Sequence, residues 1–226
     1  MEAVRAVFGT VRGHDYPPRY DIAPTEPVGI VRIGADGRRE FVLVRWGLIP
    51  GWVKDPREFA TLINARAETL LEKPSFKSAI RHRRCIVPVD WFYEWTGKKG
   101  ARQPLRIRAA DPDAAPLALA GLWEHWLGAD GSEIETMAIV TVQSNATLKV
   151  VHERMPAVLA RADADAWLDV HIVKENEATR LLRPAPETWL VVEPIGTRIG
   201  ASRGEGPDLI EAPPSTPDQR PNRGSK

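Results

Sequence analysis

The feature that most constrains this fold is a series of short apolar runs, each closed by turn-forming residues. Val28–Ile33 and Phe41–Trp46 flank Ala35-Asp36-Gly37, a sequence typical of a β-hairpin. Four further runs have strand character: Leu105–Arg108, Leu117–Trp126, Thr136–Val142 and Trp189–Pro194. Many short strands with few helices predict a single α+β domain around an antiparallel, barrel-like β-sheet with short peripheral helices.

The predicted helices are short and lie between or outside these runs. They are Glu2–Phe8, Ser75–Arg83 with Ser75 as its N-cap, Asn145–Val150, Ala162–Val170 and Lys174–Leu182. From Ala212 onward the chain is rich in Pro, Ser, Asp and Arg and has no apolar periodicity. We therefore expect one domain over residues 1–211 and a disordered tail over residues 212–226.

The charge is nearly balanced overall but uneven along the chain. There are 31 Lys and Arg residues against 30 Asp and Glu residues. From Arg57 to Arg108, however, 12 basic residues stand against 5 acidic ones, an excess of seven positive charges. This segment predicts a basic surface that attracts phosphates. The alternative is a solvated basic face that binds nothing.

Cysteine usage and hydropathy indicate where the protein works. The single cysteine, Cys85, excludes an intrachain disulfide and favours a reducing compartment. No apolar run approaches the roughly 20 residues that span a bilayer, and the N-terminus lacks the apolar length of a signal peptide. We expect a cytoplasmic protein that does not bind membranes.

The stretch Cys85–Trp95, with the sequence CIVPVDWFYEW, holds the most distinctive candidate for chemistry. Glu94 lies between Tyr93 and Trp95, and a carboxylate among aromatic side chains is poorly solvated, which raises its pKa. Such a carboxyl exchanges protons near neutral pH and suits general acid–base catalysis. The alternative puts Glu94 on the wet face of a strand whose other face carries the aromatic residues.

Three other segments carry side chains suited to binding a nucleic acid. In LINARAET, the amide of Asn64 lies two residues from the guanidinium of Arg66, on the same side of an extended chain. In VHERMP, His152 is close to Arg154, and Trp52 lies on a Gly- and Pro-rich loop. Arginine binds phosphate, tryptophan stacks on bases, and a Glu, His and Asn set manages proton transfer. Structural roles in turns and loop packing are the alternatives for each.

Cys85 is the obvious nucleophile, and the sequence argues against it. It begins an apolar strand, where a free cysteine behaves as a small core residue, and no nucleophile-elbow motif surrounds it. The five histidines lack paired ligand spacing. We expect no metal and no cofactor.

Seven motifs follow one another along most of the chain. They are RYDIAPTEP at Arg19–Pro27, RWGLIPGW at Arg45–Trp52, LINARAET at Leu62–Thr69, RCIVPVDWFYEW at Arg84–Trp95, ALAGLWEHW at Ala118–Trp126, IVTVQSNATLKVVHERMPAVL at Ile139–Leu159 and GPDLIEAP near the C-terminus. In this order they resemble the SOS-response-associated peptidase family of abasic-site processing proteins. The combination of LINARAET, the aromatic-Glu-Trp strand and HERMP is highly specific.

The resemblance implies a single α+β domain with a basic groove that binds single-stranded DNA containing abasic sites. In the family, a cysteine that becomes the first residue after removal of Met attacks the ring-opened sugar aldehyde. Its amine forms a Schiff base, its thiol closes a thiazolidine ring, and this DNA–protein crosslink shields the lesion. Members also remove their own leader peptide where one precedes the cysteine, which makes them autoproteolytic peptidases.

The resemblance also implies roles for individual residues. Asn64 would position the sugar or the N-terminal residue, Glu94 would be the acid–base, and His152 would assist proton transfer. The residues implied in DNA binding are Arg66 and Arg154 at phosphates, Pro24 and Trp52 on flanking loops, and Thr141 lining the site.

One departure from the family is large. Members open with Met-Cys-Gly-Arg-Phe ahead of a helix resembling EAVRAVFG, whereas this sequence opens at that helix, with Glu2 in second position. Cys85 cannot replace the missing residue, because ring closure needs amine and thiol on one residue. We expect a natural start further upstream, whose segment would supply a further sheet strand. True loss of the nucleophile is the alternative.

Two other functions stay open. A non-covalent single-stranded DNA-binding protein is favoured by the basic segment together with the missing nucleophile. A peptidase that uses Cys85 is the other. For the DNA-processing function we expect a monomer whose partner is abasic single-stranded DNA, associated with the nucleoid when bound.

Overall fold

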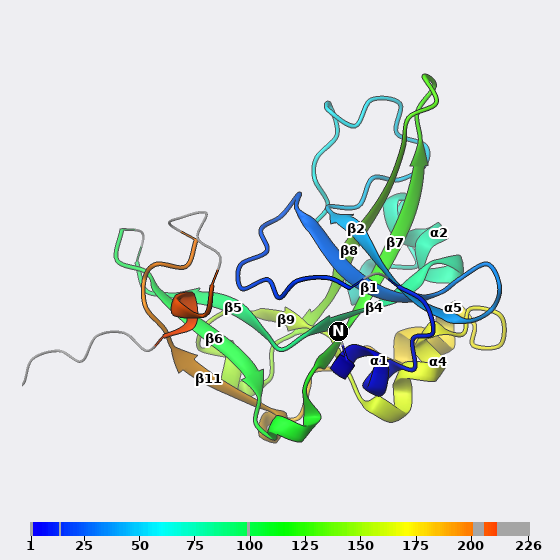
Figure 1. The fold of residues 1–226 in the computed structure, drawn as a ribbon. Coiled ribbons are helices and arrows are strands. Elements are labelled where there is room, and N and C mark those ends of the chain that lie inside the picture. Colours follow the sequence, from blue (N-terminus) through cyan, green and yellow to red (C-terminus); the bar gives the residue numbers. More distant parts are fainter. Residues whose placement is uncertain (1, 14, 99, 201–205, 212–226) are drawn as a thin grey trace, which may run out of the picture.

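Two long strands form the hairpin on which the main sheet is built. β7 (Leu117–Leu127) and β8 (Glu133–Gln143) pair antiparallel, with Gly121 opposite Ile139. Gly131 in the connecting turn adopts a φ of 82°, a conformation that favours glycine. This hairpin extends beyond the rest of the sheet (Figure 1). The computed structural model describes residues 2–13, 15–98, 100–200 and 206–211, so the predicted tail at 212–226 lies outside the described residues.

The hairpin closes into a five-stranded barrel. β7 pairs with β4 (Arg84–Val89), β4 with β1 (Pro27–Ile33), β1 with β2 (Arg39–Trp46), and β2 with β8. Three short strands extend the sheet: β3 (Asn64–Arg66), β9 (Arg154–Pro156) and β10 (Val158–Leu159). The predicted α+β fold around a barrel-like sheet is confirmed. The sheet is not purely antiparallel, because β2 and β3 run parallel to β8.

Apolar side chains fill the barrel. The fully buried residues of its strands include Ile30, Ile86, Leu119, Leu122 and Met137. Cys85 also lies in this core with no exposed surface. A Cβ at Gly121 would lie 2.9 Å from the Cys85 sulfur, so the absence of a side chain there lets β4 and β7 pack closely.

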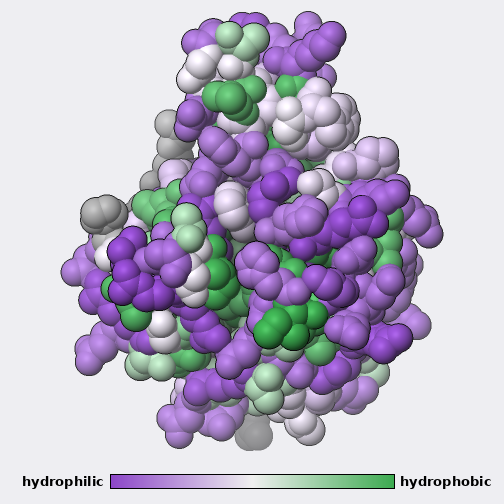
Figure 2. Space-filling model, turned by 90° about the vertical axis from the view of Figure 1, so that its right-hand side faces the viewer, coloured by the Kyte–Doolittle hydropathy of each residue, from purple (hydrophilic) through white to green (hydrophobic). Residues whose placement is uncertain are grey.

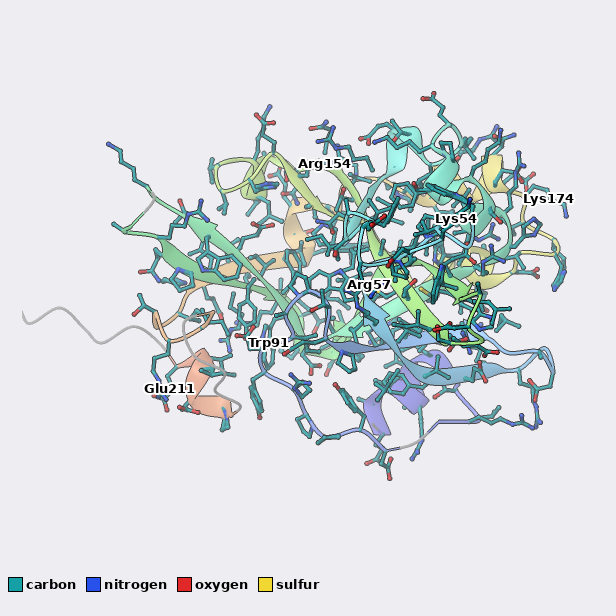
Figure 3. The ribbon with its side chains drawn as sticks, turned by 90° about the horizontal axis from the view of Figure 1, so that it is seen from above. Lys54, Arg57, Trp91, Arg154, Lys174 and Glu211 are labelled. Atoms are coloured by element: carbon teal, nitrogen blue, oxygen red, sulfur yellow. The ribbon has the colours of Figure 1, made fainter. Side chains whose placement is uncertain are left out.

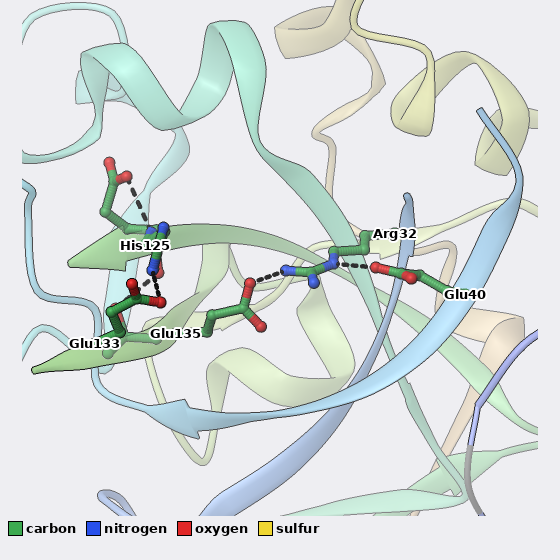
Figure 4. A network of polar contacts seen from close by, with 7 residues as sticks. Arg32, Glu40, His125, Glu133 and Glu135 are labelled. Atoms are coloured by element: carbon green, nitrogen blue, oxygen red, sulfur yellow. Dashed lines mark hydrogen bonds and ion pairs between the residues drawn. The ribbon is translucent and has the colours of Figure 1, made fainter. Parts of the chain in front are cut away.

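An arginine of β1 joins three strands of the barrel. Arg32 on β1 donates to Glu40 on β2 at 2.7 Å and to Glu135 on β8 at 2.6 Å (Figure 4). Its guanidinium carbon lies 4.1 Å from the ring centre of Trp123 on β7. With its side chain only 12% exposed, Arg32 links β1 to β7 and β8, which are not its neighbours in the barrel.

A second, three-stranded antiparallel sheet lies beside the barrel (Figure 1). It consists of β5 (Trp91–Thr96), β6 (Gln103–Ala109) and β11 (Leu190–Pro194). The stretch Cys85–Trp95 therefore does not form one strand. It breaks at the exposed Asp90, so that its apolar half belongs to the barrel and its aromatic half to the second sheet.

The helices are short, as predicted. They are α1 (Glu2–Phe8), α2 (Pro74–His82), α3 (Ala146–Lys149), α4 (Ala164–Leu168) and α5 (Glu175–Ala178), with 3-10 turns at Ala67–Thr69, Pro112–Ala114, Arg161–Asp163, Thr179–Leu181, Glu187–Trp189 and Pro207–Ile210. The predicted Ser75 cap is wrong. The helix begins at Pro74. The N–H of the first helical residue has no partner within a helix, so proline, which lacks an N–H, loses no hydrogen bond there. The predicted helices at Ala162–Val170 and Lys174–Leu182 are each part α-helix and part 3-10 turn.

A buried arginine fastens the helices to the barrel. Arg84 is 2% exposed and donates to the carbonyls of Ile80, Trp167, Asp169 and Val173. Burial lowers the pKa of Arg84 to about 10. On the face shown in Figure 2, hydrophilic residues predominate and apolar residues form small patches. None of the described helices combines the length and apolar character needed to cross a bilayer.

Candidate active site

Glu94 lies near the middle of β5 and is partly buried. The aromatic neighbours do not enclose it as the sequence predicts, because residues alternate between the two faces of a strand. Tyr93 and Trp95 face one way, with ring centres 6.5 Å apart, and Trp91 donates to the Tyr93 hydroxyl at 2.6 Å. Burial nevertheless raises the pKa of Glu94, as expected for a group with an acid–base role. Trp91, Tyr93 and Trp95 lie on the other face, as the alternative proposed, but the carboxyl is desolvated.

His152 lies in the loop between α3 and β9, with an exposed side chain. The loop follows a helix capped by Asn145, whose side chain accepts from the Leu148 N–H at 3.0 Å. The His152 N–H then donates to the Leu148 carbonyl at 2.9 Å. These contacts set the direction of the chain as it leaves α3 and so define where the imidazole lies.

The Glu94 carboxyl and the His152 imidazole lie close enough to interact electrostatically. Burial raises the pKa of Glu94, and the positive charge of a protonated His152 acts against this rise. The backbone N–H of Trp95 also donates to the carboxylate and likewise acts to lower its pKa. Two of the three predicted catalytic residues are thus brought together from positions 58 apart in the sequence.

Asn64 and Arg66 lie on β3, and both side chains are exposed. Ala65 between them is fully buried, so the expected common side of an extended segment is present. β3 runs parallel to β8, with Arg66 opposite Thr141. Among the described residues, the Arg66 guanidinium makes no hydrogen bond or ion pair. Within the same described residues, no hydrogen bond joins Asn64 to Glu94 or to His152.

Arg154, in contrast, is held on several sides. Its guanidinium donates to both carboxylate oxygens of Glu68, at 3.2 and 2.8 Å. It also donates to the hydroxyl and the carbonyl of Thr141, at 3.1 and 2.6 Å. Thr141 is only 7% exposed, so it borders the site mainly through Arg154. Sequence reasoning misses Glu68, because its partner lies 86 residues away and no local pattern signals the pair.

The two loop residues predicted to flank DNA are both exposed. Trp52 is 59% exposed and meets the ring of Phe59 edge-on, with ring centres 5.5 Å apart. Pro24 lies in the turn before β1, where the following residue, Thr25, has a φ of 78° and donates its N–H to the Trp46 carbonyl at 2.7 Å. Seen from above, Arg154 lies between the end of the molecule that carries Glu211 and the end that carries Lys174 (Figure 3).

Sequence comparison decides the family. The family model for SOS response associated peptidase (SRAP) proteins matches residues 1–202. This chain belongs to the SRAP family.

Named relatives of this SRAP chain occur in bacteria and vertebrates. The abasic site processing protein YoqW of Bacillus subtilis (strain 168) is 34% identical over 200 residues, which cover 88% of each chain. The abasic site processing protein HMCES of Gallus gallus is 32% identical over 225 residues, covering 86% of this chain and 66% of that protein.

Solved structures share the SRAP fold of this chain. A crystal structure of a protein from Bacteroides thetaiotaomicron superposes with a TM-score of 0.74 at 28% identity, covering 83% of this chain and 82% of that one. A phage-related protein from Bordetella bronchiseptica gives a TM-score of 0.69 at 30% identity, with 90% and 93% covered.

The basic surface expected of this SRAP chain is partly neutralised. Ion pairs engage Arg57 with Asp55, Arg81 with Glu175, Arg83 with Glu124, and both Arg106 and Arg108 with Glu193. Arg84 is buried. Arg66 stays exposed near Thr141 and makes no ion pair among the described residues, although the Glu68 carboxylate interacts with it electrostatically.

Cys85 does not fit a nucleophilic role. It has no exposed surface, and burial raises the pKa of its thiol, whereas a nucleophilic cysteine needs a lowered pKa. Within the described residues, no group of three or more His, Cys, Asp or Glu side chains is arranged to hold a metal ion.

Proposed function

We propose that this chain processes abasic sites in single-stranded DNA, with Glu94, His152 and Asn64 as its catalytic residues. The observation that carries the proposal is the interaction between a carboxyl whose pKa is raised by burial and the His152 imidazole. Two titratable groups with different environments suit a reaction in which protons are both given and taken. The names of YoqW and HMCES, both abasic site processing proteins, support the same substrate.

The ring-opened sugar of an abasic site offers an aldehyde, and the proposed chemistry is attack by an amine on its carbonyl carbon. The N–C bond forms, the carbonyl oxygen leaves as water, and the product is a Schiff base. Loss of water needs a proton at the oxygen, which the Glu94 carboxyl is suited to give because its raised pKa keeps it protonated to a higher pH. His152 then assists with the remaining proton, and the Asn64 amide orients the sugar.

A thiol on the same residue completes the crosslink. Its sulfur adds to the imine carbon, its proton passes to nitrogen, and a thiazolidine ring results. The one cysteine of the printed sequence is the buried Cys85, so no residue described here is assigned as the nucleophile. The peptidase activity that the family name denotes would require a nucleophile of the same kind.

The remaining proposed roles concern the DNA strand. Arg66 holds a phosphate, because its guanidinium is exposed and makes no hydrogen bond or close ion pair among the described residues, and only the charge of Glu68 acts on it from nearby. Trp52 offers an exposed ring to a base, and Pro24 and Thr141 border the path. Arg154 is the second proposed phosphate ligand, and its guanidinium is also paired with Glu68.

The test uses an oligonucleotide with one abasic site and a denaturing gel. It compares the 226-residue chain with a version that carries Met-Cys-Gly-Arg ahead of Glu2. We expect a covalent band from the extended chain, formed about 10²- to 10⁴-fold more slowly by Glu94→Gln in the same background. Absence of the band from the extended chain would overturn the proposal.

Non-covalent binding of single-stranded DNA is the second candidate. The unpaired Arg66 and the 59% exposed Trp52 favour it, since neither residue requires a reaction to bind a strand. Equal affinity for abasic and intact strands, with no covalent band from the extended chain, would support this function in place of the first.

A further inference from the structure

We propose that a cleft beside Arg154 binds an unpaired base of the DNA strand and prefers adenine. The inference rests on the proposed function, in which Arg154 and Arg66 hold phosphates of a single strand. It adds a subsite that distinguishes one base from another. The other proposed contacts reach the sugar, the phosphates and, at Trp52, the face of a base, and none of these depends on which base is present.

The cleft is large enough for a base and is mainly apolar at its walls. Its volume is about 400 Å³, within the range of about 300–1,000 Å³ for small-molecule pockets. Its apolar lining comes from three segments distant in the sequence and consists of Leu71, Val142, Leu182 and Pro184. Leu71 and Leu182 pack against the main core, and Val142 is buried in it, so these walls have fixed positions. Such walls suit the two faces of a flat ring.

Two polar side chains that line the cleft have unused hydrogen-bonding capacity. The exposed side-chain amide of Gln143, the last residue of β8, makes no hydrogen bond among the described residues. The Glu68 carboxylate accepts two hydrogen bonds from Arg154, at 3.2 and 2.8 Å, which leaves about half of its acceptor sites open. Burial acts to raise the pKa of Glu68, but hydrogen bonds and the Arg154 charge hold it below its usual range. The carboxylate is therefore ionised at neutral pH.

The cleft adjoins the proposed phosphate ligand Arg154. Gln143 lies directly opposite Arg154 in the antiparallel pairing of β8 with β9. Residues opposite each other in such a pair project from the same face of the sheet, with Cβ atoms about 4.5–5.5 Å apart. The Glu68 carboxylate, which lines the cleft, bonds directly to the Arg154 guanidinium. A strand with a phosphate at Arg154 can therefore turn a neighbouring base into the cleft.

The two polar groups favour adenine over the other bases. A glutamine amide binds adenine in a bidentate manner, because its oxygen accepts from N6–H₂ and its nitrogen donates to N7. The second N6 proton is then available to Glu68, whose carboxylate only accepts hydrogen bonds. Guanine and thymine place an oxygen where adenine has N6, and an oxygen that faces a carboxylate leaves both acceptors without a donor. Cytosine has an N4–H₂ donor but no N7, so we expect intermediate affinity.

The experiment measures non-covalent binding of the 226-residue chain to thymine oligonucleotides that carry one tetrahydrofuran site. This abasic analogue has no aldehyde, so no covalent step contributes. In separate strands, one adenine replaces thymine at successive positions on either side of the analogue, and fluorescence anisotropy gives each dissociation constant. We expect one position at which adenine binds about 5- to 100-fold more tightly than thymine, whereas guanine at that position binds like thymine.

Substitutions in the cleft connect this preference to its residues. Gln143→Ala should lower the affinity for the adenine strand to that for the thymine strand. Asn176→Ala is the matched control, because it removes an exposed amide of α5 that does not line the cleft, and it should retain the preference. Glu68→Gln replaces an acceptor with a group that also donates, so guanine should gain affinity relative to adenine. This second variant tests the subsite even if Gln143→Ala fails to fold.

Two results would overturn the inference and leave the proposed function intact. One is equal affinity for the four bases at every position. The other is a preference for adenine that neither Gln143→Ala nor Glu68→Gln changes, because stacking elsewhere on the protein would then account for it. Failure of the chain to bind any of these strands would instead contradict the proposed function itself, so the two failures are distinguishable.

Discussion

The Glu94 carboxyl on β5 and the His152 imidazole ahead of β9 interact electrostatically, although each is carried by a different sheet. β5 belongs to the three-stranded sheet, and β9 pairs with β8 of the barrel. The candidate site therefore lies where the two sheets approach each other. Substitutions that separate the sheets should affect the site even when they leave both side chains intact.

The stability of the protein should depend on pH through Glu94. Folding raises the pKa of this carboxyl above its ordinary value of 4.5, so the folded state binds the proton more tightly than the unfolded chain. The resulting stabilisation is complete below the unfolded pKa and is lost as pH rises through the folded pKa. Glu94→Gln cannot ionise, so we expect it to be more stable than the wild type at pH 7.

Urea unfolding of both proteins at pH 4 and pH 7 measures this difference. The two midpoints should converge at the lower pH, where Glu94 of the wild type is protonated. A Glu94→Gln protein that is less stable than the wild type at pH 7 would show that the ionised carboxylate stabilises the fold.

Arg66→Ala should weaken binding of single-stranded DNA without affecting the fold. Loss of one phosphate contact lowers the slope of log affinity against log salt by about 0.7 for a single strand. Arg38→Ala is the matched control, because it removes the same charge from an arginine already paired with Asp36. Fluorescence anisotropy across a salt series gives both slopes, and an equal effect of the two substitutions would count against a specific contact at Arg66.

Trp52→Ala should reduce DNA affinity by about 1–3 kcal/mol, the range for loss of one stacked base. Its ring is 59% exposed and contacts Phe59 edge-on, so unfolding stability should fall by no more than about 1.5 kcal/mol. Trp52→Phe keeps an aromatic face and should retain most of the affinity. Calorimetric titration with a short oligonucleotide would refute stacking if the Ala and Phe proteins bound equally.

Cys85→Ala should keep the activity of its parent protein. The sulfur is buried beside Gly121, and its removal should cost about 1 kcal/mol of stability, as for loss of a buried methyl group. Covalent product is measured for the chain extended by Met-Cys-Gly-Arg, with and without this substitution. Abolished product in a folded Cys85→Ala protein would restore the alternative in which Cys85 is the nucleophile.

Elements that depend on local pattern were predictable from the sequence. The hairpin from Val28 to Trp46 and the one-turn helix after Asn145 follow from turn residues and a capping side chain, and both are present. The change of sheet at Asp90 was not predictable, because one charged residue within a run of apolar and aromatic residues does not signal it. Parallel pairing of β3 with β8 joins segments about 75 residues apart, and local periodicity does not report such contacts.

The candidate site divides in the same way. Glu94 and His152 were identified as residue types, and their proximity depends on how two sheets pack. The raised pKa of Glu94 was predicted for a partly wrong reason, since its aromatic neighbours point to the opposite face of β5. Glu68 could not be identified as a residue of the site, because its partner Arg154 lies on a strand distant in the sequence.

The most direct test of the account is the titration of the Glu94 carboxyl, followed by ¹³C NMR in the wild type and in His152→Gln. The account predicts a pKa above the ordinary glutamate value in the wild type, because the carboxyl is buried. It predicts a still higher pKa in His152→Gln, because the imidazolium charge that favours ionisation is gone. A pKa in the ordinary range that does not respond to His152→Gln would contradict the meeting of these two groups, and with it the proposed site.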